Sequence, residues 1–271
     1  MDINLRTQSA KNYIPNHGEQ PFFANRGKNY LSKILPSGAI SEFYQIKNSI
    51  QQQPILVIPD GCMDIIFECN PVKPTARIFG PILHMQNVPM QPNINYFGVR
   101  FFPGVIPEFI QASAENLLNN SINFTDVVAN SEDLIREIAI QSEIEQQINL
   151  FLQHFPNQLK RNYSVTTEFI ISTILNDNED FKIKLLEEKT GYCTRHIQRV
   201  FKQEIGISIK TFSCIMRFQS AIHALTSQTR TRLSDLTYDL GYNDQAHLHK
   251  EFKKFINMSP SGFVKHFEEY I

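Results

Sequence analysis

The sequence has few cysteines and no close cysteine pair. Its four cysteines, Cys62, Cys69, Cys193 and Cys214, are scattered along 271 residues. This spacing matches neither a zinc site nor the disulfide framework of a small secreted domain, so we expect reduced thiols in a cytoplasmic protein. There is also no apolar stretch of membrane-spanning length, and the residues after Met1 do not resemble a signal peptide.

The sequence also lacks an overall positive charge. Its formal net charge is −1, so the composition alone does not indicate a nucleic-acid partner. Residues 161–271 hold 15 Lys and Arg against 13 Asp and Glu, whereas residues 1–160 hold 11 against 14. Because this excess is small, the case for DNA binding depends on where the basic residues are placed.

One pattern occurs twice between Phe181 and Phe267. Each copy reads as a short helix, a turn of glycine and an aromatic residue (Gly191-Tyr192 and Gly241-Tyr242), and a second helix. Because only glycine takes a positive φ cheaply, this is the break that a helix-turn-helix needs. Aligning the second helices pairs His196 with His247, Ile197 with Leu248, Arg199 with Lys250, Phe201 with Phe252 and Lys202 with Lys253.

The second helix of each copy has an apolar face and a basic face. The helical spacing predicts an inward stripe of Ile197, Val200 and Phe201 in the first copy and of Leu248, Phe252 and Phe255 in the second. Thr194, and either Asn243 or Asp244, are candidate N-caps of these helices.

Arg, Gln and Lys on the outward face are the side chains that bind base edges and phosphates in a major groove. A solvated basic face on an ordinary helix is the alternative, but two copies behind matching turns favour DNA. We predict base and groove contacts from Arg195, Gln198, Arg199, Gln245, His247, His249 and Lys250, and phosphate contacts from Lys202, Lys253 and Lys254.

Residues 181–267 resemble the tandem helix-turn-helix DNA-binding domain of AraC/XylS-type transcription regulators. The second copy carries the resemblance most clearly, from Leu233 to Phe255, and it is closed by Met258-Ser259-Pro260-Ser261-Gly262-Phe263. The resemblance implies that a long helix, here Ser208 to about Thr226, holds both reading helices on one face of the DNA. One departure is Ser208-Ile209, where the family usually has Ser-Pro; the loss is mild, because proline is not required to start a helix.

The segment from Asn29 to Phe102 has the pattern of β-structure. We predict a hairpin of Ile55–Ile58 and Met63–Glu68 around Pro59-Asp60-Gly61, with further strands at Arg77–Pro81 and Tyr96–Phe102. Short strands at this spacing predict a small sandwich or barrel. The motifs Pro-Asp-Gly-Cys at 59–62, Phe-Gly-Pro at 79–81 and Phe-Gly-Val-Arg-Phe at 97–101 are similar to the N-terminal domain of a subset of AraC-type regulators, which implies a cupin-like fold but no fixed ligand.

The same segment lacks the ligands of a metal-dependent cupin enzyme. Such sites use a His-x-His pair, a carboxylate and a later histidine, and this segment has one histidine, His84. We therefore expect no metal, no cofactor and no catalytic residues.

Arg100 lies on an otherwise apolar predicted strand and has two interpretations. With Asp64, it is a candidate for binding an anionic ligand, because a guanidinium can hold a carboxylate bidentately. Alternatively it closes an internal salt bridge with Asp64 or Glu68, because buried charges are normally paired. We interpret Asp60 as a turn residue and the phenylalanines around Arg100 as core.

After Pro103 the pattern predicts helices at Val105–Gln111, Ala114–Asn119 and Ser131–Phe155. The last has an apolar stripe that includes Ile135, Ile138, Ile144 and Ile148, and it could pack on the β-domain or pair with a second subunit. A further helix is predicted at Thr166–Leu175, followed by a loop at residues 176–179.

We therefore expect an α+β chain: a β-rich sensing or dimerisation domain in residues 1–155, a linker in 156–163, and a tandem helix-turn-helix domain in 164–271. The expected function is cytoplasmic, sequence-specific transcription regulation. The expected partners are double-stranded DNA, RNA polymerase, a small-molecule effector and a second copy of the chain.

Two alternatives stay open. One is a DNA-repair enzyme fused to the same DNA-binding module, which needs a zinc-bound cysteine cluster or a nucleophilic cysteine beside a histidine; the spacing of Cys62 and Cys69 supplies neither. The other is a regulator whose N-terminal domain only dimerises or binds a protein.

Overall fold

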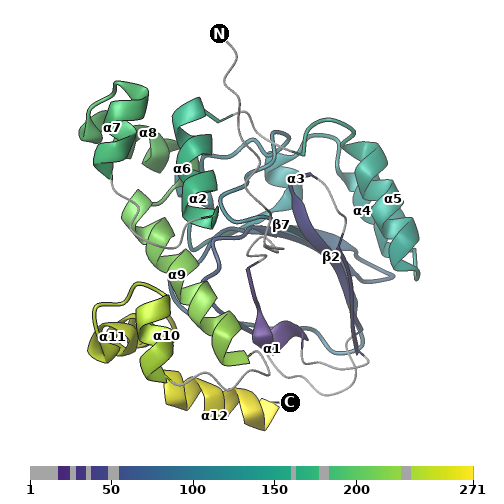
Figure 1. Ribbon diagram of the computed structural model, residues 1–271. Helices are drawn as coiled ribbons and strands as arrows, with labels where there is room; N and C mark the ends of the chain where they lie inside the picture. The colour runs from purple at the N-terminus through teal and green to yellow at the C-terminus, as the bar shows by residue number, and fades with distance from the viewer. Residues whose placement is uncertain are drawn as a thin grey trace.

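The computed structural model describes residues 18–24, 29–34, 38–47, 55–159, 163–176, 183–226 and 233–270. Figure 1 shows an antiparallel β-rich N-terminal part followed by helices, which is the α+β class that the sequence predicts. Residues 160–162 of the predicted linker and residues 177–179 of the predicted loop lie outside the described part of the chain.

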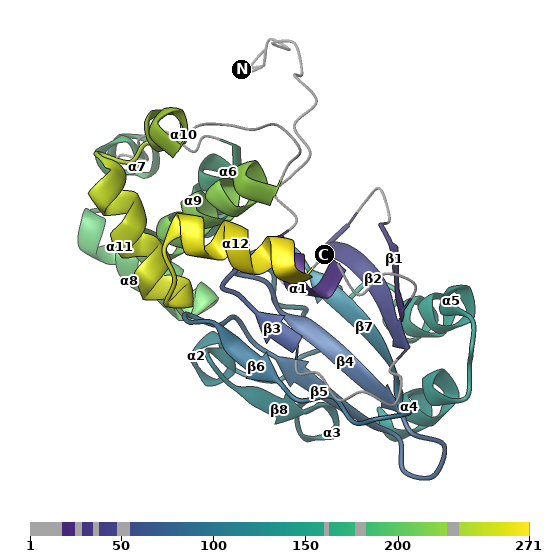
Figure 2. The ribbon, with the colours of Figure 1, turned by 90° about the horizontal axis from the view of Figure 1, so that it is seen from below.

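A six-stranded antiparallel sheet forms the centre of the N-terminal part. Its strands lie in the order β1 (Tyr30–Lys33), β2 (Ile40–Lys47), β7 (Asn95–Phe101), β4 (Asp64–Cys69), β5 (Thr75–Phe79) and β8 (Ser121–Asn123). A second sheet has two strands, β3 (Ile55–Val57) and β6 (Gln86–Val88). Figure 2 shows this small sheet beside β4 and β5, and Ile55 packs with Tyr44 and Ile46 of β2 in one apolar cluster.

The predicted hairpin between Ile55–Ile58 and Met63–Glu68 is wrong. β3 pairs with β6, whereas β4 pairs with β5 and β7. The turn itself is present, because the Asp60 carboxylate accepts a hydrogen bond from the Cys62 N–H (2.9 Å) and Gly61 takes a φ of +73°. The turn carries the chain from one sheet to the other instead of folding it back.

The two faces of the large sheet are covered differently. On one face, fully buried Phe43, Phe67 and Phe97 pack in an apolar core together with residues of the following helices. These helices are α3 (Phe124–Val127), α4 (Glu132–Ala139) and α5 (Ile144–His154). Because side chains alternate along a strand, Asp64 and Arg100 point to the opposite face, toward β3 and β6.

The helix predicted at Ser131–Phe155 is interrupted and forms α4 and α5. Gln147, which is buried, stabilises the break: its side-chain N–H group donates to the carbonyls of Ile138 (3.0 Å) and Gln141 (3.2 Å), at and just after the end of α4. The predicted apolar stripe packs on the sheet, so this face is not available to a second subunit.

Other local predictions also need correction. No helix forms at Val105–Gln111, and α2 covers only Ala114–Leu117 of the predicted Ala114–Asn119. Strand β8 and helix α3 were not predicted. Pairing with distant residues explains β8, which forms the edge of the sheet next to β5.

Gly98 lies opposite Tyr44, its register partner on β2. A Cβ atom on Gly98 would lie 2.0 Å from the Tyr44 Cζ, and the tyrosine is held because it is fully buried and its hydroxyl donates to Asp64 (3.0 Å). We expect Gly98→Ala to lower the free energy of unfolding by about 1–3 kcal/mol in urea titrations. Gly262→Ala is the control, because its Cβ would meet only the Ser259 hydroxyl. Equal stability of the two variants would contradict the tight packing.

The C-terminal part consists of helices around a shared core. They are α6 (Val165–Asn176), α7 (Ile183–Thr190), α8 (Thr194–Ile205), α9 (Ile209–Thr226), α10 (Leu233–Asp239), α11 (Gln245–Ile256) and α12 (Pro260–Tyr270). Figure 1 shows α9 running from the group α6–α8 to the group α10–α12. Within the described residues, no helix is long and apolar enough to cross a membrane.

Helix α9 corresponds to the predicted long helix from Ser208 to about Thr226. It begins without proline, because the Ser208 hydroxyl accepts a hydrogen bond from the Thr211 N–H (3.1 Å) and so occupies one of the free donors of the first turn. Ser208 therefore supplies the start signal that the family usually reinforces with proline.

Candidate nucleic-acid interface

Helices α7 and α8 form the first helix-turn-helix. Gly191 takes a φ of +70° between them, and Gly206 ends α8 with a φ of +87°. The predicted stripe is confirmed in the main: Ile197 and Phe201 are fully buried, and the Phe201 ring packs edge-on against Phe212 of α9 (5.8 Å between centroids).

The N-cap predicted at Thr194 is wrong, because Thr194 is the first helical residue of α8. Glu187 of α7 supplies the missing acceptor: its Oε1 accepts from the Thr194 N–H (2.5 Å) and from the Thr194 hydroxyl (2.6 Å). A carboxylate at this position also interacts favourably with the helix dipole. The cap therefore comes from the preceding helix and fixes the angle between α7 and α8.

The opposite face of α8 is basic and exposed. Arg195, Gln198, Arg199 and Lys202 are all exposed, as predicted from their spacing. No acidic residue lies between Tyr192 and Gln203, so this face carries only positive and neutral groups. Arg199 is within hydrogen-bond distance of Gln203 Oε1 (3.5 Å), which is a neutral neighbour.

Helices α10 and α11 form the second helix-turn-helix. Of the two candidate N-caps, Asp244 is the one that caps α11, because its side chain accepts from the His247 N–H (2.7 Å). Leu248, Phe252 and Phe255 are buried, which confirms the predicted inward stripe.

A buried polar contact removes the one acidic residue of α11 from its exposed face. Glu251 is 6% exposed and accepts from Arg217 Nη2 of α9 (2.7 Å) and from the Tyr242 hydroxyl (2.9 Å). Burial and the Glu251 carboxylate both raise the pKa of Tyr242, so the tyrosine stays a donor. Sequence analysis missed these residues, because the three of them come from α9, the turn and α11.

The exposed face of α11 is basic like that of α8. Five of the predicted contact residues are exposed: Gln245, His249, Lys250, Lys253 and Lys254. His247 differs, because only 35% of its side chain is exposed and its ring packs edge-on against Tyr242 (5.3 Å between centroids). Its Nδ1 also accepts from the Asn243 N–H (3.4 Å). The structure therefore places His247 partly within the turn.

A cavity of about 250 Å³ lies between the two sheets of the N-terminal part. Its polar end holds Arg100, Asp60 and Asp64, and apolar side chains such as Ile66 and Val88 line other parts. The candidate ligand residues Arg100 and Asp64 thus lie on the wall of the same cavity.

Arg100 closes the internal salt bridge that was one of its two interpretations. It is 2% exposed, and its Nε and Nη2 each lie 3.1 Å from one Asp64 oxygen. The register explains this, because Arg100 of β7 lies opposite Asp64 of β4 and opposite Glu42 of β2. Arg100 Nη1 also lies 3.4 Å from Asp60 Oδ2, so Asp60 is more than a turn residue. Glu68, the other predicted partner, is not among the ion pairs of Arg100.

The charges at this cluster depend on each other. Burial lowers the pKa of Arg100, but the carboxylates of Asp64 and Asp60 more than offset it and hold this pKa well above its usual value. Burial raises the pKa of Asp64 and of Glu42, and Arg100 opposes both shifts. The Arg100 guanidinium is therefore the ion-pair partner of three carboxylates, those of Glu42, Asp60 and Asp64.

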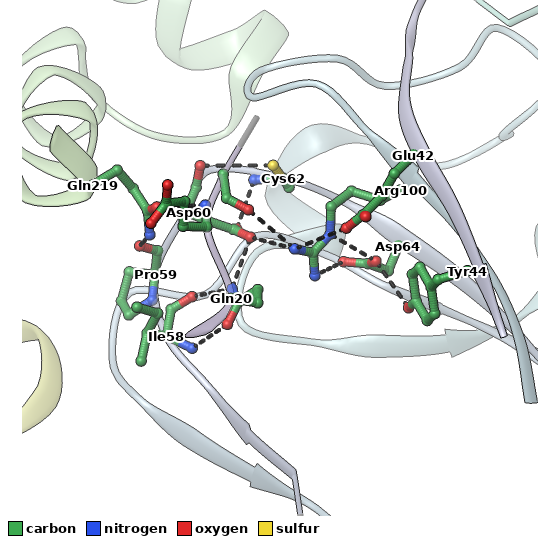
Figure 3. A network of polar contacts seen from close by, with 12 residues as sticks. Gln20, Glu42, Tyr44, Ile58, Pro59, Asp60, Cys62, Asp64, Arg100 and Gln219 are labelled. Carbon is green, nitrogen blue, oxygen red and sulfur yellow. Dashed lines mark hydrogen bonds and ion pairs between the residues drawn. The ribbon is translucent and has the colours of Figure 1, made fainter. Parts of the chain in front are cut away.

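The segment at residues 18–20 joins this cluster to α9 (Figure 3). The Gly18 carbonyl accepts from Arg100 Nη1 (3.2 Å), and Gln20 Nε2 donates to Asp60 (2.8 Å). Gln219 of α9, which is fully buried, accepts from the Glu19 N–H and donates to the Pro59 carbonyl (2.7 Å each). The N-terminal part is thus hydrogen-bonded to the helix that connects the two helix-turn-helix units.

Cys62 and Cys69, the two cysteines of the N-terminal part, do not show the chemistry expected of a repair enzyme. All four are free thiols, and among the described residues no group of His, Cys, Asp and Glu could hold a metal ion. Burial raises the pKa of Cys62 well above its usual value and that of Cys69 to about 11, so both stay protonated and poorly nucleophilic.

Two family models match the chain. Residues 186–266 match a helix-turn-helix domain, and residues 28–123 match a domain of unknown function (DUF6597). The first range contains both helix-turn-helix turns and both basic helices, and the second contains the strands and charged cluster around the cavity.

The chain is similar in sequence to proteins named as transcription regulators. The probable transcription factor PqrA of Proteus vulgaris is 31% identical over 93 residues, which are 34% of this chain and 75% of that protein. An uncharacterized HTH-type transcriptional regulator of Haemophilus influenzae is 30% identical over 96 residues, 35% of this chain, and the match spans only 32% of that protein. A solved structure of a probable AraC family transcriptional regulator from Rhodopseudomonas palustris has a TM-score of 0.33 and 21% identity, over 38% of this chain and 93% of that one.

These relatives are transcription regulators, not enzymes. The match to PqrA covers most of that protein. The two helix-turn-helix turns described above lie within residues 186–266, the range that matches the helix-turn-helix domain model. The chain belongs to the AraC family of DNA-binding transcription regulators.

Proposed function

We propose that this regulator reads a specific DNA sequence with α8 and α11 in successive major grooves on one face of the duplex. Two such helices, each with an exposed basic face, are joined through α9, and grooves on one face recur about every 34 Å. The observation that carries the proposal is the burial of Glu251 by Arg217 and Tyr242, because it leaves the outer face of α11 without a negative charge.

The exposed side chains divide into two roles. Arg195, Gln198 and Arg199 on α8 have the donors and acceptors that distinguish bases, and Gln245, His249 and Lys250 repeat this on α11. Lys202, Lys253 and Lys254 lie toward the C-terminal ends of the same helices and are assigned to phosphates, which set register without reading sequence. His247 contributes less, because its ring packs on the turn.

The N-terminal part is assigned the control of DNA binding. We place it in residues 1–155, before a linker at 156–163 and the DNA-binding domain at 164–271. Its cavity supports control by a small-molecule effector, and its hydrogen bonds to α9 give the effector a route to the DNA-binding helices. RNA polymerase is the proposed target of regulation, in the cytoplasm, and a homodimer is proposed for the functional state.

The test is binding of the full chain to the promoter region upstream of its own gene, compared with a random duplex of equal length. We expect a preference of about tenfold or more, with affinity falling steeply as salt rises. Equal affinity for both duplexes across the salt series, together with no duplex enriched from a random pool, would contradict sequence-specific reading.

Lys253→Ala tests the phosphate role. We expect it to weaken binding to specific and random duplexes alike and to lower the salt slope by about one, because one fewer phosphate is neutralised. Lys73→Ala is the matched control, since Lys73 is an exposed lysine on the turn between β4 and β5. A loss confined to the specific duplex would instead assign Lys253 to a base.

A further inference from the structure

The cavity between the two sheets shares a wall with a loop that contacts α11. Ile82 and Gln86 both line the cavity, and residues 83–85 between them reach the DNA-binding part. The Met85 N–H donates to the Phe255 carbonyl (2.7 Å), and His84 Nδ1 lies 2.9 Å from the Lys254 carbonyl. Carbonyls in the last turn of a helix have no partner within it, so this loop completes the C-terminal end of α11.

Asn119 connects the cavity to the same loop directly. It lines the cavity, and its side-chain oxygen accepts from the Leu83 N–H (2.8 Å), while its own N–H donates to the Pro81 carbonyl (2.8 Å). A molecule that displaces Asn119 therefore breaks its hydrogen bonds to Pro81 and Leu83. These residues lie two to four positions before Met85 in the same loop, so their displacement also moves the Met85 contact with α11. The backbone is closely packed at this point, because a Cβ on Gly80 would lie 1.8 Å from the Leu117 carbonyl oxygen.

The charges at the polar end of the cavity set the class of ligand. The N–H groups of Arg100 are directed to Asp64, Asp60 and the Gly18 carbonyl. An anionic ligand would have to displace one of these carboxylates and leave it buried without its partner, which is costly. Three carboxylates surround one guanidinium, so a cation adds the charge that the cluster lacks.

We propose that the cavity binds a small amine with an apolar body, and that the loop at residues 82–86 transmits its occupancy to α11. The ammonium lies at Asp60 and Asp64, and the apolar body packs on side chains such as Ile66 and Val88. The inference rests on the proposed function, because its final readout is DNA affinity.

The first experiment compares three compounds of nearly equal shape on the full chain at pH 7: cyclohexylamine, cyclohexanol and cyclohexanecarboxylate. Calorimetry is expected to show that the amine binds about tenfold tighter than the carboxylate, because the carboxylate meets the buried carboxylates of Asp60 and Asp64, whereas the amine meets the single guanidinium of Arg100. Val88→Trp, which fills the cavity, is expected to abolish amine binding. Tighter binding of the carboxylate, or amine binding that survives Val88→Trp, would overturn the assignment of the site.

The second experiment measures coupling. DNA affinity is first measured without any compound, on a duplex enriched from a random pool. A lack of DNA binding is thereby distinguished from a lack of amine binding in the cavity. Saturating amine is then expected to change the DNA dissociation constant by about fivefold or more, and DNA must change the amine dissociation constant by the same factor. Amine binding with no change in DNA affinity would overturn the coupling.

A matched pair of variants locates the route. Met85→Pro removes the N–H that donates to Phe255, whereas Met85→Ala shortens the side chain and keeps that N–H. We expect both variants to bind the amine, and only Met85→Pro to lose the response of DNA affinity. A response that persists in a folded Met85→Pro would exclude this loop as the route. If Met85→Pro does not fold, the effect of the amine on the DNA affinity of the unmodified chain decides the proposal.

Discussion

Replacing Arg100 with methionine is expected to lower the free energy of unfolding by about 3–5 kcal/mol, because it leaves buried carboxylates without their cation. Asp64 receives two of the Arg100 N–H groups, and Asp60 lies 3.4 Å from Nη1. Methionine fills much of the same volume but offers no donor. The measurement is urea-induced unfolding of the full chain, followed by far-ultraviolet circular dichroism.

Arg77→Met is the matched control for this experiment. Arg77 is an exposed arginine on β5 whose guanidinium bonds to Asn123 and Ser121. Exposed substitutions of this kind change stability by about 0.5 kcal/mol or less. The double variant Arg100→Met/Asp64→Leu should recover part of the loss, because it also removes a buried charge. An Arg100→Met variant as stable as Arg77→Met would contradict the role of the cluster.

Arg199→Ala is expected to weaken binding to the specific duplex by about 1–3 kcal/mol and to relax the preference at one base pair. Arg199 is exposed on α8, and its neighbours Gln203 and His196 carry no negative charge that would compete with DNA for its guanidinium. The measurement is fluorescence anisotropy on the specific duplex, on a random duplex, and on single-base variants of the specific one.

Arg136→Ala is the control for Arg199→Ala. Arg136 is an exposed arginine on α4, which packs on the β-sheet, and it pairs with Asp133 of the same helix. We expect this variant to bind both duplexes like the wild type. An equal loss on specific and random DNA for Arg199→Ala would remove its base-reading role and assign it to the phosphates.

The helix-turn-helix units were predictable because their signals are local. The glycine turns, the inward stripes around Ile197 and Leu248, and the basic outer faces all lie within a few residues of each other. The N-cap at Asp244 could be predicted for the same reason. The cap of α8 was not, because its acceptor Glu187 lies on the preceding helix.

The β-rich part was harder to predict because strand pairing is not local. The turn at Pro59–Cys62 was evident, yet β3 and β4 go to different sheets, and that depends on partners at residues 86–88 and 95–101. The identity of the Arg100 partners follows from the same pairing. The sequence offered Asp64 and Glu68, and only the register of β4 with β7 selects Asp64.

The most useful residue that the sequence did not single out is Glu251. In the sequence it interrupts the basic run of α11, and it argues against a DNA-reading face there. The structure shows it paired with Arg217 and Tyr242 and buried, so it stabilises the contact of α11 with α9. An acidic residue in a basic helix was the one available signal for a buried partner, because charges are rarely buried unpaired.

The most direct test of the central claim is methylation interference on a duplex that the full chain selects. Methylation of guanine N7 blocks major-groove contacts. Two reading helices predict two patches of interference on one face of the duplex, about one helical turn apart. Arg199→Ala should weaken one patch and leave the other in place. A single patch, or two patches on opposite faces, would contradict reading by α8 and α11 of the same molecule.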